Sequence, residues 1–138
     1  LPTRRQRQMC IRDRSISFKP SSVSLDELLI NSDYITLHVP AQKKYLIDKE
    51  EFSKMKDGVG IVNAARGGVI NEESLIDFID SGKIKFAGLD TFENEPNPSI
   101  KTLMNSKISL TPHIGAATSE AQERIGLELA DQIISLIK

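Results

Sequence analysis

The sequence predicts an α/β fold built on a partial, doubly wound parallel sheet. Short apolar runs alternate with helix-start signals along the chain, which is typical of strands joined by helical crossovers. Polar residues follow these runs at regular spacing, because His38, Arg66, Asp90 and His113 are separated by 28, 24 and 23 residues. Ligands of parallel sheets bind at the carboxyl ends of the strands. We therefore expect these four residues to lie at one edge of the sheet.

Four strands are predicted, at residues 34–39, 59–64, 86–89 and 108–111, each rich in Ile, Leu, Val or Phe. Helices are expected after Ser24 and Asp48, each followed three residues later by Glu, and after Asn71, with Gly82 as the stop signal. Residues 94–99 read as a Pro-rich loop. A long helix should begin near Ser119, with an apolar face that suits a core or a subunit interface; its residues are Ile125, Leu129, Ile133 and Leu136.

The first 14 residues, LPTRRQRQMCIRDR, differ in composition from the rest of the chain. They hold five of the seven arginines and the only cysteine, Cys10, and carry +5 and −1, whereas the other 124 residues carry 13 basic and 18 acidic groups. A basic arm for nucleic acid or anionic lipid is one interpretation. The other, which we favour, is a non-native segment that resembles sequencing-adapter read-through, and it is excluded from the fold reasoning.

Residues 15–138 are then expected to form a truncated domain that ends in the long helix. They contain no cysteine, which fits a reducing compartment. No apolar run reaches the length of a membrane span, so we do not expect a membrane partner. With the arginine-rich segment set aside, we do not expect a nucleic-acid partner either. We also expect no metal site.

Arg66, Glu95 and His113 are the predicted catalytic residues, in the strings NAARGG, DTFENEP and TPHIGAAT. Arginine binds a carboxylate with a planar fork of donors, histidine transfers a proton near neutral pH, and a carboxylate beside the histidine favours its charged form. Each residue alone has an ordinary explanation: an ion pair for the arginine, a solvated acid for the glutamate and a structural role for the histidine. Only the three residues together predict a site that binds a small 2-oxo or 2-hydroxy acid and transfers a proton to or from it.

Four blocks in order, SDYITLHVP, GIVNAARGGVINEESL, FAGLDTFENEP and SLTPHIGAATSEAQERIG, resemble the NAD-dependent D-isomer-specific 2-hydroxyacid dehydrogenases, most of all bacterial D-3-phosphoglycerate dehydrogenases. The resemblance implies the C-terminal part of a Rossmann-type NAD-binding domain and hydride exchange between NAD(H) and a D-2-hydroxy or 2-oxo acid. It implies that Arg66 binds the substrate carboxylate, that His113 is the acid/base and that Glu95 assists His113.

The same resemblance implies the cofactor-binding residues. Asp90 would hydrogen-bond the nicotinamide amide, or else only cap the turn that follows it. Ala64, Ala65 and Gly115 would line the nicotinamide end together with Arg66 and His113. His38 and Pro40 match the loop beside the cofactor. For His38, a packed position at the strand end is an equally good explanation.

The chain departs from the family in lacking the G-x-G-x-x-G loop and the acidic residue for the adenosine ribose. We therefore expect this chain alone to bind NAD poorly and to be inactive. A glyoxylate or hydroxypyruvate reductase, and an NAD-sensing corepressor-type scaffold of the same fold, remain alternatives to a phosphoglycerate dehydrogenase of serine biosynthesis. The full-length enzyme is expected to be a cytoplasmic homo-oligomer.

Overall fold

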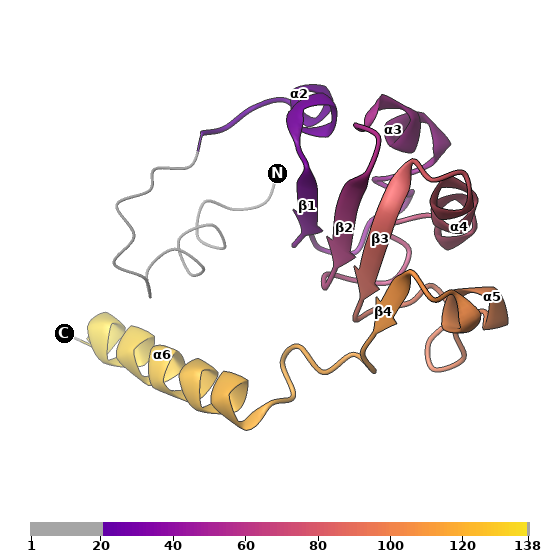
Figure 1. Ribbon diagram of the computed structural model, residues 1–138. Coiled ribbons are helices and arrows are strands. Elements are labelled where there is room, and N and C mark those ends of the chain that lie inside the picture. Colours follow the sequence, from indigo (N-terminus) through magenta and orange to yellow (C-terminus); the bar gives the residue numbers. More distant parts are fainter. Residues whose placement is uncertain (1–20, 138) are drawn as a thin grey trace.

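The computed structural model describes residues 21–137 and shows a four-stranded parallel sheet in the order β1-β2-β3-β4 (Figure 1). The strands are β1 (Tyr34–Leu37), β2 (Val59–Asn63), β3 (Ile84–Leu89) and β4 (Ile108–Leu110). Their central residues form one continuous register across the sheet, in which Ile35 pairs with Ile61, Ile61 with Ala87 and Ala87 with Ile108. The predicted α/β class and parallel sheet are confirmed. The arginine-rich residues 1–14 lie outside the described residues.

The helices are α2 (Leu25–Asn31), α3 (Lys49–Lys54), α4 (Glu72–Asp80), α5 (Ile100–Met104) and α6 (Ser119–Ile137). The predicted caps form as expected. Ser24 accepts a hydrogen bond from the backbone N–H of Glu27, Asp48 closes a complete capping box with Glu51, and Asn71 accepts from the N–H of Ser74. These bonds satisfy backbone donors that have no partner inside the helix.

The structure corrects several predicted boundaries. β1 ends at Leu37 rather than at residue 39, and β3 begins at Ile84 rather than at residue 86. A register shift beside Val59 and Gly60 leaves Lys85 without a partner residue in β2, so the alternation that marks a strand is interrupted there. The short helix α5 was not predicted. Its five residues are too few to show helical periodicity, and Ser99 makes no side-chain cap bond.

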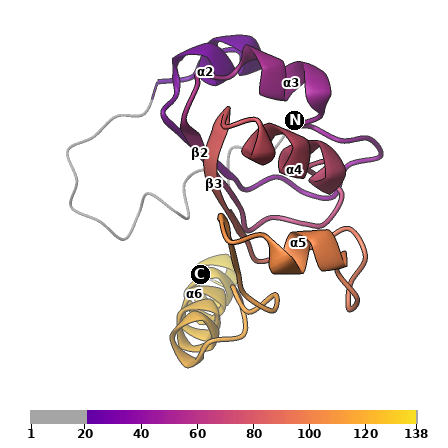
Figure 2. The same cartoon turned by 45° about the vertical axis from the view of Figure 1, so that its right-hand side comes forward.

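One face of the sheet carries the core. Ile35, Leu37, Ile61, Ala87 and Leu89 are buried on this face. Figure 2 shows α3, α4 and α5 gathered on the same side of the strands. The helices contribute buried side chains to a single cluster, among them Leu29, Phe52, Leu75 and Ile79. Burial of this apolar surface is the main stabilising contribution to the fold.

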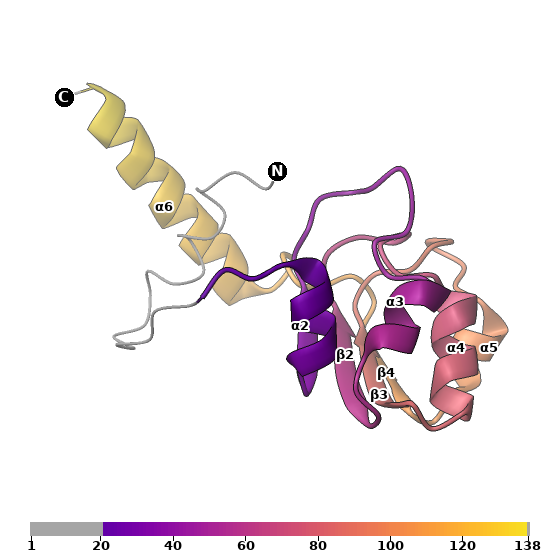
Figure 3. The ribbon, with the colours of Figure 1, turned by 90° about the horizontal axis from the view of Figure 1, so that it is seen from above.

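The opposite face of the sheet is open in the described part of the chain. Tyr34, Val62 and Phe86 are 76%, 38% and 39% exposed, although they belong to a parallel sheet, a type usually covered on both faces. Helix α6 has no buried residue and projects away from the sheet (Figure 3). Of the two roles predicted for Leu129, Ile133 and Leu136, a place in the core is not seen here, because the exposed connection of residues 111–118 carries the helix outward. Their role in a subunit interface remains a prediction.

Within residues 21–137, none of the helices combines the length and the apolar character that crossing a bilayer would require.

Candidate active site

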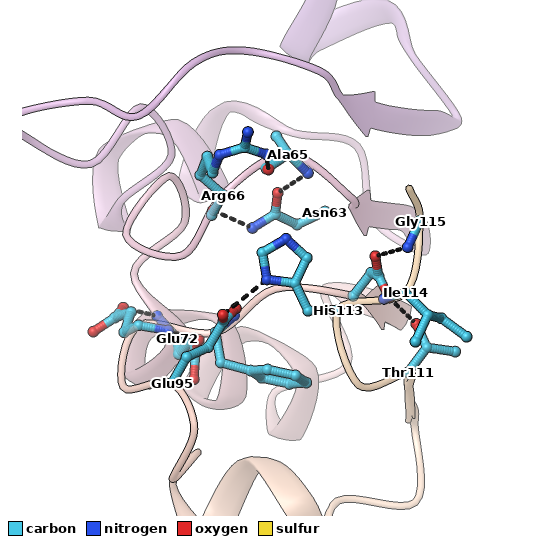
Figure 4. Close-up of polar contacts among 12 residues, drawn as sticks. Asn63, Ala65, Arg66, Glu72, Glu95, Thr111, His113, Ile114 and Gly115 are labelled. Carbon is cyan, nitrogen blue, oxygen red and sulfur yellow. Dashed lines mark hydrogen bonds and ion pairs between the residues drawn. The ribbon is translucent and has the colours of Figure 1, made fainter. Parts of the chain in front are cut away.

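The candidate site lies where β2, β3 and β4 end, as the strand-end rule predicts. Each strand is followed by a loop that carries one of the expected catalytic side chains (Figure 4). Arg66 follows β2, Glu95 follows β3 and His113 follows β4. Residues separated by up to 47 positions in sequence are thereby gathered at one edge of the sheet.

The turn that carries Arg66 is held by Asn63, the buried last residue of β2. The Asn63 side chain accepts from the N–H of Ala65 at 3.1 Å and donates to the carbonyl of Arg66 at 3.1 Å. The exposed Arg66 side chain donates from Nη1 to the carbonyl of Ala65 at 2.6 Å. Since a guanidinium has five N–H donors, most of the Arg66 fork is left for a ligand. Asn63 was not singled out in the sequence analysis, although it stands within the quoted string NAARGG.

The glycines after Arg66 have different roles. A Cβ atom on Gly67 would lie only 1.8 Å from the carbonyl oxygen of Phe92, so the arginine loop packs directly against the loop after β3. Gly68 has a φ of 74° and supplies the left-handed turn that glycine adopts readily. The close approach at Gly67 is thus to protein backbone.

Glu95 and His113 form a hydrogen-bonded pair. Oε2 of Glu95 lies 2.8 Å from Nδ1 of His113, and Oε1 accepts from the N–H of Phe92 at 2.9 Å. The hydrogen bond from His113, followed by the one from Phe92, lowers the pKa of the Glu95 carboxyl below its ordinary value. The predicted proximity of the two residues is confirmed.

The His113 ring lies between the arginine loop and Glu95. In Figure 4 its second nitrogen, Nε2, faces the side on which Asn63 and Arg66 lie. Because Glu95 engages Nδ1, Nε2 is the atom left to exchange a proton with a bound molecule. His113 has a φ of 54°, which is unusual for a residue with a side chain.

The carboxylate of Asp90 contacts the loop that carries His113. Oδ1 accepts from the hydroxyl of Thr111 at 2.6 Å and from the N–H of Ile114 at 2.9 Å, and Oδ2 accepts from the N–H of Gly115 at 2.9 Å. Burial raises the pKa of Asp90, but these three hydrogen bonds outweigh burial and the net effect is a lowered pKa. Thr111 was not assigned a role from the sequence.

Two glutamates brace the loop between β3 and Glu95. Glu72 accepts from the N–H of Glu93 at 2.7 Å, and Glu93 accepts from the N–H of Glu72 at 2.8 Å. Tyr45 also donates its hydroxyl to Glu93 at 3.1 Å. This reciprocal pair was not predicted from the sequence, since its members are 21 residues apart.

The remaining predicted cofactor residues lie at or just beyond strand ends. Ala64, an exposed residue, follows β2 directly. His38 follows β1, and its Nε2 bonds the hydroxyl of Thr36 at 2.9 Å. The carbonyl of Pro40 accepts from the Gln42 side chain. No hydrogen bond joins His38 to Arg66, Glu95 or His113 within residues 21–137.

A cavity of about 380 Å³ lies beside the Glu95–His113 pair. Its wall is mostly apolar and comes from the loop after β3, from α5 and from the end of β4; it includes Phe92, Pro96, Pro98, Leu103, Leu110 and Pro112. Apolar surroundings beside a hydrogen-bonded pair reduce competition from water. No group of three or more His, Cys, Asp or Glu side chains is placed to bind a metal in the described part of the chain.

Comparison with known proteins identifies the family of the chain. The family model described as D-isomer specific 2-hydroxyacid dehydrogenase, NAD binding domain, matches residues 4–115. The chain belongs to this family. The match begins inside residues 1–14, whose foreign origin remains a prediction.

Relatives and solved structures carry the family's activities in their names. The chain is 50% identical over 116 residues to a hydroxypyruvate reductase of Thermotoga maritima, with 80% of this chain and 38% of the relative covered. It is 43% identical over 130 residues to a D-3-phosphoglycerate dehydrogenase of Archaeoglobus fulgidus, covering 92% and 25%. A glyoxylate reductase structure from Paecilomyes thermophila superimposes with a TM-score of 0.71 at 42% identity, covering 84% and 36%.

The chain spans about a quarter to two-fifths of the length of these three dehydrogenases. The expected α/β NAD-binding domain of a D-2-hydroxyacid dehydrogenase is therefore confirmed for the part of the protein that this chain covers.

Proposed function

We propose that this chain carries the catalytic groups of an NAD-dependent D-2-hydroxyacid dehydrogenase. The observation that carries the proposal is the 2.8 Å Glu95–His113 pair at the strand ends, with Arg66 on the other side of the histidine ring. A proton-transferring group next to a carboxylate-binding group is what reversible reduction of a 2-oxo acid requires.

Arg66 holds the substrate carboxylate in this proposal. Only its Nη1 atom donates within the described chain, to Ala65, so the outer edge of the guanidinium can make two parallel hydrogen bonds to a carboxylate. This fixes the C2 carbon of the substrate between the arginine and the histidine. Asn63 keeps the arginine turn in place from beneath.

His113 moves the proton on the substrate oxygen at C2. In the oxidative direction Nε2 takes the hydroxyl proton, and in the reductive direction the imidazolium returns it to the carbonyl oxygen. Glu95 stays ionised near neutral pH, because the hydrogen bond from His113 lowers the pKa of its carboxyl, and this carboxylate holds Nδ1 of the ring. The N–H of Phe92 fixes the other oxygen of this carboxylate, which limits rotation of the pair.

The residues present fit the nicotinamide end of NAD. A carboxylate offers about four acceptor sites, and Asp90 uses three of them within the protein, which leaves one for an amide N–H. Gly115 bonds Asp90 directly and Ala64 is exposed at the end of β2, whereas the Ala65 side chain is buried and only its backbone would face the cofactor. His38 and Pro40 extend this surface along the end of β1. Bound NAD would supply the hydride acceptor and NADH the hydride donor for C2.

The substrate is a small 2-oxo or D-2-hydroxy acid. The names of the relatives support hydroxypyruvate and 3-phosphoglycerate as narrower choices, and the carboxylate recognised by Arg66 is common to both.

We also propose that the full-length protein forms homo-oligomers. The lack of cysteine in residues 15–138 supports a reducing compartment such as the cytoplasm.

The test uses a chimera in which residues 21–137 replace the aligned segment of the Thermotoga maritima hydroxypyruvate reductase. Steady-state rates are measured with NADH and hydroxypyruvate, glyoxylate or 3-phosphohydroxypyruvate. His113→Ala should abolish most turnover while NADH still binds. Arg66→Lys should lower kcat/KM by about tenfold or more, because lysine keeps the charge and loses the fork.

Lys101→Arg exchanges the same two residue types at an exposed position of α5 and serves as the control. Normal rates in the Arg66→Lys and His113→Ala chimeras would contradict the proposed roles.

A further inference from the structure

The loop after β4 holds His113 in a backbone conformation that a residue with a side chain rarely adopts. The φ of His113 is 54°, and non-glycine residues in this region need support from their surroundings. Locally the loop is held by the N–H of His113, which donates to the carbonyl of Thr111 at 3.0 Å. The orientation of the ring toward Glu95 depends on this conformation.

Asp90 contacts the loop on both sides of His113. The Thr111 hydroxyl reaches it from two residues before the histidine, and the N–H groups of Ile114 and Gly115 reach it from one and two residues after. Residues 112 and 113 therefore lie between Thr111 and Ile114, which both bond the carboxylate of Asp90. Hydrogen bonds to an ionised acceptor are stronger than neutral ones.

The fit between the loop and this carboxylate is close. A Cβ atom on Gly115 would lie 3.0 Å from Oδ2 of Asp90, so glycine allows the third bond to form. The backbone N–H of Asp90 in turn donates to the carbonyl of Asn63 at 3.0 Å. Asp90 thus connects the end of β2, just before the loop of Arg66, with the loop that carries His113.

We propose that Asp90 is a positioning residue, whose carboxylate fixes the left-handed conformation of His113 and so aims its ring. This inference rests on the proposed function of His113 as the acid/base. It goes beyond a contact with the nicotinamide amide, because three of the acceptor sites of Asp90 serve the histidine loop. A positioning role makes Asp90 important for the rate of turnover, whereas a cofactor contact makes it important for NADH affinity.

Two variants separate these roles. Asp90→Asn replaces one carboxylate oxygen with an NH2 group, which cannot accept from an N–H donor. Thr111→Val removes one of the three bonds and leaves Asp90 unchanged, and Thr111→Ser restores the hydroxyl as the matched control. In the whole 138-residue chain, NMR measures amide exchange at Ile114 and Gly115 and the residual dipolar couplings of His113.

We expect both amides to exchange faster and the His113 couplings to change in Asp90→Asn and in Thr111→Val, with Thr111→Ser close to the wild type. In the chimera, kcat should fall by about tenfold in both variants, the equivalent of one hydrogen bond. The NADH dissociation constant of Thr111→Val, which leaves the Asp90 carboxylate intact, should stay within about twofold of the wild type. Thr111→Ser should recover kcat.

An Asp90→Asn chimera that loses NADH affinity but keeps kcat at saturating NADH would overturn the proposal, as would unchanged His113 couplings in both variants. The His113→Ala chimera is measured in parallel. If that variant keeps its activity, the proposed acid/base role fails, and the NMR measurements still decide whether Asp90 fixes the loop.

Discussion

The backbone of Gly67 packs against the carbonyl of Phe92 so closely that a Cβ atom on the glycine would lie 1.8 Å from that oxygen. This contact sets the distance between two loops of the site, because Arg66 precedes the glycine and Glu95 follows the phenylalanine. The spacing between the substrate-binding arginine and the proton-transferring pair is therefore fixed by backbone contact, in addition to the hydrogen bonds that hold each loop.

Gly67→Ala should destabilise the fold by about 1–3 kcal/mol, since the added methyl group must push backbone aside. Urea unfolding monitored by circular dichroism measures the change. Gly126→Ala is the control, because a Cβ atom there meets nothing within 4 Å and alanine is the better helix former by up to about 1 kcal/mol. Equal stabilities of Gly67→Ala and the wild type would show that the two loops can separate freely.

Glu95→Gln should remove a pH-dependent contribution to stability. The pKa of Glu95 is lowered from 4.5, chiefly by the hydrogen bond from His113. A carboxyl with a lowered folded-state pKa contributes stability that is present above its ordinary pKa and is lost as the pH falls through the folded-state value. The wild type should therefore be the more stable of the two at pH 6–7, and this difference should be lost as the pH falls below 4.5 and through the lowered folded-state pKa. Urea midpoints across pH test this, with the exposed Glu120→Gln as control.

The same substitution should lower the rate of the chimera. In ketone reduction His113 donates the proton, and Glu95→Gln removes the carboxylate that holds Nδ1 of its ring at 2.8 Å. The kcat of hydroxypyruvate reduction should fall by about tenfold, the equivalent of one hydrogen bond, while NADH still binds. An unchanged kcat would make Glu95 a solvated loop acid.

Glu72→Gln and Glu72→Ala should have opposite consequences. Burial is the main cause of the raised pKa of Glu72, so ionisation of this carboxyl opposes folding. The contribution of Glu72 to stability therefore falls as the pH rises through its folded-state pKa. Glutamine keeps an oxygen acceptor for the N–H of Glu93 and removes the charge. The variant should be at least as stable as the wild type at pH 7–8, and its advantage should disappear toward pH 4.5.

Alanine at position 72 leaves the N–H of Glu93 and the buried hydroxyl of Thr102 without their partner. We expect a loss of about 1–3 kcal/mol in the free energy of unfolding. Thermal unfolding of both variants at several pH values provides the measurement. A destabilised Glu72→Gln variant at pH 8 would indicate that the charge itself is needed.

The open sheet face and the apolar side of α6 should make the isolated chain self-associate. Phe86 and Tyr34 are exposed on the sheet, and Leu129 and Ile133 are 55% and 48% exposed on the helix; contiguous exposed apolar surface of this kind promotes association. Sedimentation velocity over a concentration series should show association that Leu129→Gln with Ile133→Gln reduces. Met104→Gln changes an apolar residue on α5 that is 79% exposed, more than either helix residue, and should leave association intact. A compact monomer at all concentrations would contradict this expectation.

The sequence by itself determined the parallel α/β architecture, the helix caps and the three catalytic candidates. These features depend on local patterns. Ser24, Asp48 and Asn71 cap helices through bonds to residues one to three positions away, and β-rich runs between helix signals lead to parallel strands because the crossovers between them are long enough. Strand ends then gather Arg66, Glu95 and His113 by geometry alone.

Only the tertiary structure decided how the loops are held against one another. The contact of Gly67 with Phe92, the Glu72–Glu93 pair and the bonds of Asp90 to the histidine loop join residues 21 to 25 positions apart. No periodicity encodes such contacts, because each depends on where two separately folded loops come to rest. Likewise, the sequence predicts that α6 has an apolar face. The exposure of that face follows from the direction in which residues 111–118 leave the sheet.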